Sequence, residues 1–146
     1  MYAIGSDHGG YALKQEIMKH LSERGIAYRD YGTYSDESCD YPDYGEAVGR
    51  AVASGECERG IVVCGTGIGI SIAANKVRGV RCALCGDCLS AQMAREHNDA
   101  NVLALGARVL GAGLALKIVD TFLDSAFAGG RHERRVAKLM AIEGGE

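Results

Sequence analysis

The segment around Cys64 has the residue types and spacing that point most directly to chemistry. An apolar run from Gly60 to Cys64 leads into three alternating glycines, at positions 65, 67 and 69, and then into small residues up to Ser71. A buried strand that ends in a glycine-rich turn and a helix directs backbone N–H groups at one point, where they stabilise a phosphate or a developing oxyanion. The spacing is neither Gly-x-Gly-x-x-Gly nor a P-loop, which argues against dinucleotides and nucleoside triphosphates. An anion site and a purely structural turn both remain open.

Cys64 adds a reactive group to this turn. A thiol between a strand end and a helix N-terminus lies where negative charge on sulfur is favoured, and a thiolate serves as a base or as a nucleophile. The alternative is that Cys64 is a small buried apolar side chain, which is the commoner role of free cysteine.

Polar side chains near the N-terminus and after residue 40 form a second candidate group. Asp7 and His8 follow a short apolar run and suit the hydroxyls of a substrate, although Asp7 could equally be the N-cap of a following helix. Tyr41 and Asp43 flank Pro42, the only proline, and by themselves indicate a plain polar loop.

His97 is the candidate general acid or base, because its imidazole titrates near neutral pH. It opens the stretch His97-Asn-Asp-Ala-Asn101 before an apolar run, and we expect it on or beside the same rim as Cys64. An alternative is a helix C-cap, with Asn98 or Asn101 closing the turn.

Two arginines near the C-terminus could hold a phosphate. Arg131 and Arg135 are four residues apart and share one helix face, and a guanidinium binds phosphate in a bidentate manner. The alternative is a solvated charged helix. Cys82, Cys85 and Cys88 have the spacing that opens an iron–sulfur motif, but on a strand the first two side chains leave opposite faces, so we reject that interpretation.

The elements that must position these residues alternate between short apolar runs and segments of helical period, which predicts an α/β fold with parallel strands and crossover helices. In such a sheet ligands bind beyond the carboxyl ends of the strands. We expect one domain over residues 1–146: a three-layer sandwich with a five-stranded parallel sheet and a C-terminal helical extension at 130–146. The strands are predicted at 2–5, 27–31, 60–64, 81–85 and 102–105. The helices are predicted from residue 12 to the turn at Gly25, at 44–54, in a short segment after Gly67, and at 87–96, 111–125 and 133–142.

Composition limits the function classes. Apolar residues make up 47% and charged residues 24% of 146 residues, which excludes a disordered chain. The net charge of −3 gives no global attraction to nucleic acid or anionic lipid, and no apolar run approaches the length of a membrane span. Six cysteines in a chain of this apolar content favour free thiols, and hence a reducing cytoplasm, over a disulfide framework.

Several motifs together resemble one family, the type B ribose-5-phosphate isomerases. They are Gly5-Ser-Asp-His-Gly-Gly10, Asp40-Tyr-Pro-Asp43, Cys64-Gly-Thr-Gly-Ile-Gly-Ile-Ser71, Arg95-Glu-His-Asn-Asp-Ala-Asn101 and Gly130-Arg-His-Glu-Arg-Arg135. The resemblance extends over residues 1 to about 140, with the motifs in the family's order. It implies a Rossmann-like fold and a metal-free, cofactor-free aldose–ketose isomerase that opens a sugar ring and moves a proton between C2 and C1 through a cis-enediolate.

The resemblance also implies roles for individual residues. Cys64 would be the base and His97 would assist ring opening. The enediolate oxygens would lie in a hole formed by Gly65, Thr66, Gly67, Ile68, Gly69 and Ser71. Sugar contacts would come from Asp7, His8, Tyr41 and Asn98. The phosphate clamp would come from Arg108, Arg131 and Arg135, with His8 as a further candidate. In the family the site crosses a dimer interface, with residues matching His97 and Asn98 reaching the partner's cysteine pocket.

Some members of the family use a carboxylate in place of the cysteine; we expect it at position 75, which is Asn here, and this favours the cysteine subtype. Ribose 5-phosphate is the expected substrate, and the alternatives are allose or galactose 6-phosphate. Two other functions stay open: a non-catalytic phosphosugar sensor, and a thiol oxidoreductase that uses Cys82 and Cys85. The assembly is expected to be a homodimer or a dimer of dimers.

Overall fold

Five parallel strands form the centre of the protein, in the order β2-β1-β3-β5-β4. The computed structural model describes residues 1–145. The strands are β1 (Tyr2–Ser6), β2 (Tyr28–Asp30), β3 (Arg59–Cys64), β4 (Cys82–Leu84) and β5 (Val102–Gly106). The predicted five-stranded parallel sheet is therefore confirmed, and the two edge strands are shorter than predicted.

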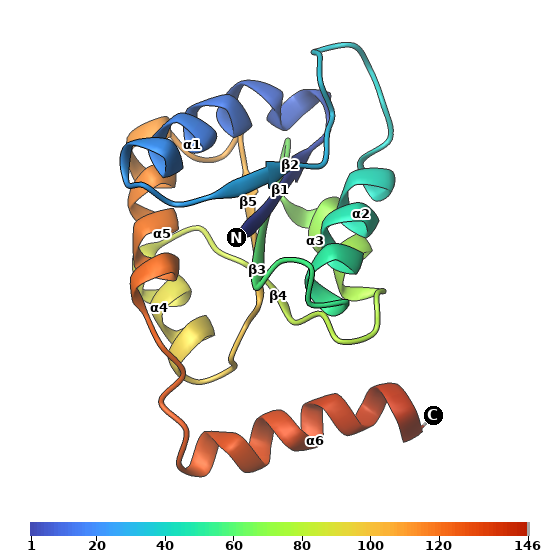
Figure 1. Cartoon of the computed structure of the whole chain (residues 1–146), viewed down its shortest axis with the longest axis vertical. Helices are drawn as coiled ribbons and strands as arrows, with labels where there is room; N and C mark the ends of the chain where they lie inside the picture. The colour runs from blue at the N-terminus through green and yellow to red at the C-terminus, as the bar shows by residue number, and fades with distance from the viewer. Residues whose placement is uncertain (146) are drawn as a thin grey trace.

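Helices cover both faces of the sheet, as Figure 1 shows, because the three central strands are apolar on both sides. Side chains of α1 (Tyr11–Glu23), α4 (Cys88–Glu96) and α5 (Ala112–Asp124) form one core with one face. Those of α2 (Tyr41–Ala53) and α3 (Ile68–Asn75) form a second core with the other face. The predicted three-layer arrangement is confirmed.

The last helix, α6 (Arg131–Gly145), lies outside the sandwich and runs across the edge of the sheet at which the strands begin (Figure 1). The predicted helical extension at 130–146 is found as far as residue 145, and residue 146 lies outside the described residues. No helix among residues 1–145 is long and apolar enough to cross a membrane.

The start of α2 corrects one prediction. Tyr41 and Asp43 were expected in a plain loop before a helix at 44, but the helix already begins at Tyr41. Pro42 explains the difference, because its fixed φ suits the first helical turn and its missing N–H has no intrahelical partner there.

The sheet has a topological switch point between the parallel strands β1 and β3, where the connections leave toward opposite sides of the sheet. From β1 the chain crosses to β2 on one side, whereas from β3 it crosses through α3 toward β4 on the other side. Ligands of open parallel sheets bind at such a switch point, beyond the carboxyl ends of the two diverging strands. The loops at this point are residues 7–10 and 64–67.

Candidate active site

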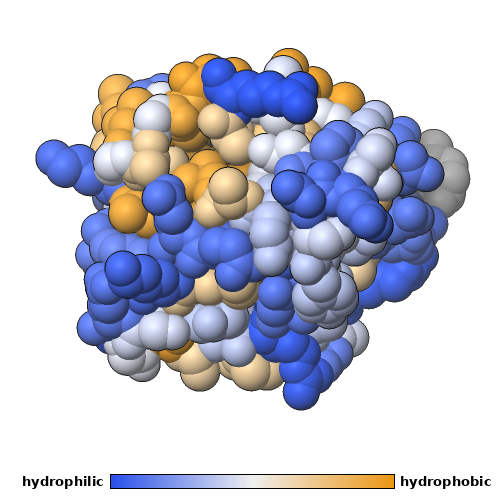
Figure 2. Space-filling view, turned by 90° about the horizontal axis from the view of Figure 1, so that it is seen from above, coloured by the Kyte–Doolittle hydropathy of each residue, from blue (hydrophilic) through white to orange (hydrophobic). Residues whose placement is uncertain are grey.

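The two loops at the switch point pack against each other. The Asp7 N–H donates to the Val63 carbonyl at 3.2 Å. Gly9 lies so close to the second loop that an added methyl group would stand 3.4 Å from the Gly65 nitrogen. Residues far apart in the sequence therefore form one surface. Figure 2, which views the molecule from above, shows a largely hydrophilic face with hydrophobic residues gathered at one side.

Cys64 ends β3 at the floor of this surface and is only 4% exposed. Its Sγ accepts a hydrogen bond from the Gly67 N–H at 3.2 Å. Gly67 has φ +80°, a left-handed conformation that L side chains rarely adopt, and it is the N-cap of α3. A donor and a helix N-terminus directed at sulfur both stabilise negative charge there, as a base that accepts and returns a proton requires.

The turn after Cys64 keeps some amide groups available for a ligand. Thr66 Oγ1 accepts from the Ile68 N–H at 3.2 Å, while Ser71 Oγ donates to the Ile68 carbonyl at 2.7 Å. Within residues 1–145 the N–H groups of Gly65 and Thr66 have no protein acceptor. They are the free donors for an oxyanion, whereas the Ser71 hydroxyl already has a structural partner.

Tyr41 lies directly against this turn. A methyl group added at Gly69 would stand 2.5 Å from Tyr41 Cε1, so only glycine allows the phenol ring to lie here. Tyr41 is 41% exposed, which leaves part of its ring available for a ligand. The early start of α2 is what carries Tyr41 to this position.

Asp7 and Arg108 complete the group at this edge. The Asp7 carboxylate caps the short helix η1 (His8–Gly10) by accepting from the Gly10 N–H at 3.0 Å, which confirms the N-cap interpretation and leaves its second oxygen for a ligand. The Arg108 N–H donates to the Gly65 carbonyl at 2.8 Å. Its guanidinium lies over Gly65, where an added methyl group would stand 3.3 Å from Nη1.

The other predicted residues lie at the opposite edge of the sheet. His97 is the C-cap of α4 and precedes β5, so it cannot share the rim of Cys64 within one chain, and the expectation from sequence was wrong. The C-cap interpretation is confirmed, but Asp99 closes the turn, with φ +48°, instead of Asn98 or Asn101. At roughly 3.3 Å per residue, the five residues of β5 separate the two edges by about 16 Å.

Arg131 and Arg135 lie with His97 at this second edge. The rings of His97 and His132 stack with centroids 4.2 Å apart and an interplanar angle of 13°, which fixes the start of α6 beside the end of α4. Burial together with the charges of His97, Arg131 and Arg135 lowers the pKa of His132. Asn98 is exposed beside them.

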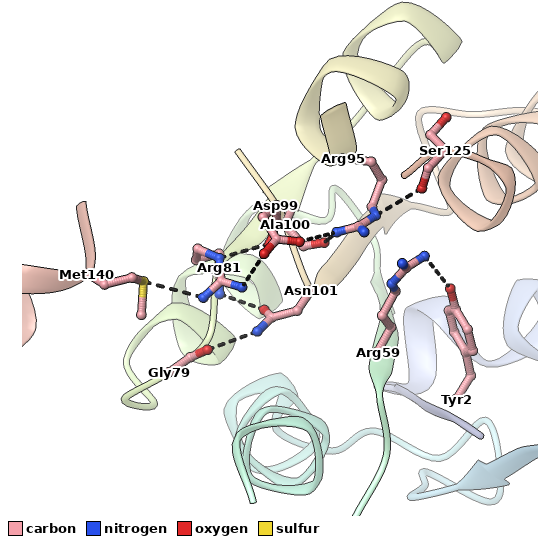
Figure 3. A network of polar contacts seen from close by, with 10 residues as sticks. All are labelled: Tyr2, Arg59, Gly79, Arg81, Arg95, Asp99, Ala100, Asn101, Ser125 and Met140. Atoms are coloured by element: carbon pink, nitrogen blue, oxygen red, sulfur yellow. Dashed lines mark hydrogen bonds and ion pairs between the residues drawn. The ribbon is translucent and has the colours of Figure 1, made fainter. Parts of the chain in front are cut away.

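A polar network holds this second edge in place (Figure 3). Arg95 is 4% exposed and its Nη1 bonds Asp99 Oδ1 at 2.9 Å and the Ala100 carbonyl at 2.7 Å. Arg81 donates to the Asp99 carbonyl at 2.8 Å and contacts Met140 Sδ of α6 at 3.4 Å. The loop that carries His97 and Asn98 is therefore tied both to the sheet and to α6.

The cysteines after residue 80 do not form a redox centre. All six cysteines are free thiols. Cys82 packs with the core of α2 and α3, while Cys85 belongs to the core of α1, α4 and α5, so the two side chains leave opposite faces as expected. Burial raises the pKa of Cys82 far above its usual value and that of Cys85 to about 11. Neither thiol is activated.

Asn75 does not lie where a substitute base would be needed. It ends α3, two helical turns from Cys64, and is exposed. Its side-chain amide bonds both backbone groups of Cys82, donating to the carbonyl at 2.9 Å and accepting from the N–H at 2.8 Å. The residue at position 75 therefore gives no support for the cysteine subtype, which stays a prediction from the presence of Cys64.

Two features of the site had no signal in the sequence. The Cys39 N–H donates to His8 Nδ1 at 3.2 Å, and Lys14 is completely buried beneath the loop that carries Cys39. Backbone donors follow no residue pattern, and a lysine on an amphipathic helix is normally solvated. Among residues 1–145 no cluster of His, Cys, Asp and Glu is arranged to hold a metal ion.

Comparison with known proteins gives a consistent result. A family model described as Ribose/Galactose Isomerase matches residues 2–139. The chain is 54% identical over 141 residues to Ribose-5-phosphate isomerase B of Escherichia coli strain K12, covering 97% of this chain and 95% of that protein.

Solved structures agree. Ribose-5-phosphate isomerase B of Clostridium thermocellum has 61% identity and a TM-score of 0.97, covering 98% of this chain and 97% of the other. Ribose-5-phosphate isomerase B of Mycoplasma genitalium, solved with bound ribulose 5-phosphate, has 41% identity and a TM-score of 0.94, covering 99% and 97%. On these grounds the chain belongs to the ribose/galactose isomerase family.

Proposed function

We propose that this chain is a ribose-5-phosphate isomerase of the pentose phosphate pathway, which interconverts ribose 5-phosphate and ribulose 5-phosphate. The observation that carries the proposal is the buried Cys64 Sγ, held by the Gly67 N–H at a switch point with free amide donors beside it. The similarity to ribose-5-phosphate isomerase B from several organisms supports the same activity. Residues 1–146 would act as one isomerase domain.

In the proposed mechanism Cys64 is the base. After ring opening, the thiolate removes the proton from C2, the released pair forms the C1–C2 double bond, and the carbonyl pair moves onto O1 to give the cis-enediolate. Charge then gathers on the oxygens of C1 and C2, where the N–H groups of Gly65 and Thr66 would receive it without reorganisation. The C2 hydroxyl proton passes to O1 and the thiol returns its proton to C1, which leaves the C2 carbonyl of the ketose. Asp7, His8 and Tyr41 would position the sugar, and Arg108 its phosphate.

Hydrogen exchange with solvent tests the base. In D₂O the parent enzyme should introduce deuterium into the sugar, and Cys64→Ala should abolish both this exchange and isomerisation while phosphosugar binding persists. Cys57→Ala is the matched control, because it removes another buried thiol, one that precedes β3 at the opposite edge of the sheet, and it should keep the exchange. Exchange that continues unchanged in Cys64→Ala would exclude Cys64 as the base.

We further propose that the complete site needs two copies of the chain. His97, Asn98, Arg131 and Arg135 lie at the opposite edge from Cys64, so one chain cannot bring them to its own pocket. Exposed apolar side chains on α3 (Ile68 and Ile72) and on α6 support an interface, as does a groove of about 460 Å³ beneath α6 that Asn98 and Leu139 help to line. In the dimer, Arg108 would come from one subunit and Arg131 and Arg135 from its partner.

Complementation between subunits tests the shared site. Cys64→Ala inactivates one half of it and Arg131→Ala the other, so each variant alone should be inactive. After co-refolding at equal amounts, half of the two-fold dimers are mixed and each contains one intact site, so about a quarter of parent activity should return. A mixture that stays inactive would show that the site does not cross between chains.

Two alternatives give different results with the same protein. An isomerase of allose or galactose 6-phosphate would show a higher kcat/KM for that sugar than for ribose 5-phosphate. A non-catalytic sensor would bind phosphosugars saturably and interconvert none of them. Free thiols at all six cysteines support the reducing cytoplasm as the place of action.

A further inference from the structure

His8 has a partner that fixes its protonation pattern. The peptide N–H of Cys39 donates to His8 Nδ1 at 3.2 Å. A peptide nitrogen can only donate, so Nδ1 must be the acceptor and carries no proton. In the neutral imidazole the proton then lies on Nε2, which makes His8 a hydrogen-bond donor to whatever faces that atom.

The segment that supplies this N–H, residues 31–40 between β2 and α2, has no regular structure of its own. Its first part follows the end of β1, with the Thr33 N–H donating to the Ser6 carbonyl and the Ser6 N–H to the Gly32 carbonyl, each at 2.7 Å. Its outer part reaches the body of the protein through the bond from Cys39 to His8. The position of the donor thus depends on how firmly the base of the loop is held.

Lys14 holds that base. Its side chain is 0% exposed, and its Nζ donates to Asp30 Oδ1 at 2.6 Å and to the Thr33 carbonyl at 2.5 Å. The same Asp30 oxygen accepts from the Gly32 N–H at 2.8 Å. A buried ammonium is costly unless its partners stay in place, so the contact opposes any displacement of the loop.

Two aromatic rings complete the surroundings of this ammonium. The centroids of Tyr11 and Tyr34 lie 5.6 and 5.4 Å from Lys14 Nζ, within the range of cation–π attraction. Lys14 therefore joins α1, the end of β2 and the start of the loop, although it lies on no surface that a substrate could reach.

We propose that the 31–40 loop is a positioning element that fixes His8 as the Nε2–H tautomer, through the Cys39 N–H, and that Lys14 is its buried anchor. Resting on the proposed function, this makes the Nε2–H of His8 a hydrogen-bond donor to the bound phosphosugar. Lys14 and Cys39 act through His8 and touch no substrate.

Histidine tautomers are read directly from ¹⁵N chemical shifts and long-range ¹⁵N–¹H couplings in the free, ¹⁵N-histidine-labelled protein. There are only four histidines, and the signals that His8→Gln removes identify His8. We expect the Nε2–H tautomer in the parent and a mixture of tautomers in Cys39→Pro, which lacks the donor. An Nδ1–H tautomer in the parent, or an unchanged spectrum of His8 in Cys39→Pro, would overturn the proposal.

Kinetics show whether the tautomer matters to the substrate. Loss of one neutral hydrogen bond should raise the KM of Cys39→Pro for ribose 5-phosphate by about 3- to 10-fold, with kcat changed less than about twofold. Cys39→Ala keeps the N–H and removes only the Sγ, which lies 3.9 Å from His8 Nδ1, so it should retain both the tautomer and the KM. Asp36→Pro introduces a proline elsewhere in the same exposed loop. A similar rise in its KM would show that distortion of the loop, not loss of the Cys39 N–H, is the cause.

The anchor is tested by Lys14→Met, which should mix the tautomers and raise KM as Cys39→Pro does. Asp30→Asn, which keeps the acceptor for Gly32 but weakens the hold on Lys14, gives the same test where Lys14→Met does not fold. A pure Nε2–H signal in both folded variants would remove the role of Lys14. The NMR result needs no substrate, so a failure of the isomerase assignment would be seen separately, as absent turnover in the parent.

Discussion

Because Tyr41 lies so close to Gly69, we expect replacement of Gly69 to affect activity much more than stability. In Gly69→Ala the added methyl group would stand 2.5 Å from Tyr41 Cε1 and 2.6 Å from Cζ. Carbon atoms in contact normally lie about 3.5–4.0 Å apart, so the ring must move by about 1 Å or more. Tyr41 is 41% exposed, and its ring is free to swing toward solvent.

Stability and activity should therefore respond differently. Alanine is preferred over glycine in helices by up to about 1 kcal/mol, which offsets the loss of ring contacts, so we expect Tm to change by less than about 4 °C. Displacement of a sugar contact by about 1 Å is severe for catalysis, and kcat/KM for ribose 5-phosphate should fall by about 10- to 100-fold.

Gly113→Ala is the matched control. Gly113 is the second residue of α5, as Gly69 is of α3, but an added methyl group there meets nothing within 4 Å. The control should keep the parent kcat/KM, measured by the formation of ribulose 5-phosphate, with Tm followed by calorimetry. If Gly69→Ala retains kcat/KM within about twofold, Tyr41 is not part of the binding surface and our reasoning about this turn is wrong.

Three further predictions concern other parts of the chain. Asn75→Asp cannot donate to the Cys82 carbonyl and should lower the free energy of unfolding by about 1 kcal/mol in urea titrations, with an unchanged m value; an unaltered midpoint would contradict the role of this amide at the edge strand. The folded protein lowers the pKa of His132, so the unfolded chain binds protons more readily as pH falls through the ordinary histidine range. The Tm should therefore drop between pH 7.5 and 5.5, and His132→Gln should lessen that drop. Equal drops in parent and variant would refute this sign. Cys82 and Cys85, whose raised pKa values keep them as thiols, should resist maleimide at pH 7.5 and form no disulfide with each other under mild oxidation, as mass spectrometry would show.

The position of Cys64 and of the glycine turn could be predicted from the sequence because these residues are close together in the chain. Cys64 and the glycines after it lie within one strand–turn–helix unit, and the apolar run before them fixes which end of a parallel strand they occupy. The layers of the sandwich follow from the same alternation, since strands buried on both faces must be covered by helices. The layered fold was therefore predicted correctly, and Cys64 with its glycines lies at the predicted strand end, while the chemical role of Cys64 stays a prediction.

Most of what was missed depends on contacts distant in the sequence, whereas the error for His97 came from overlooking the direction of the strand that follows it. Tyr41 looks like a loop residue, but α2 begins there because Pro42 suits a first turn and the ring packs on Gly69. His97 was placed at the wrong rim, although a residue just before a parallel strand must lie at the edge where that strand begins. The bond from Cys39 to His8 involves a backbone donor in an irregular loop, and no side-chain pattern could have indicated it.

The candidate site residues lie in two groups at opposite edges of the sheet, which bears on whether one chain can be active alone. Cys64, its amide donors and Arg108 lie at the carboxyl edge of the sheet, whereas His97, Arg131 and Arg135 lie at the amino edge, about 16 Å away along β5. The central strands are buried on both faces, so no hinge within the chain can bring the two edges together. The network of Arg95, Arg81 and Asp99 also ties His97 to its own sheet. If ring opening and phosphate binding use the second group, an isolated chain holds the base and the oxyanion donors but only one of the three clamp arginines, and catalysis then depends on association.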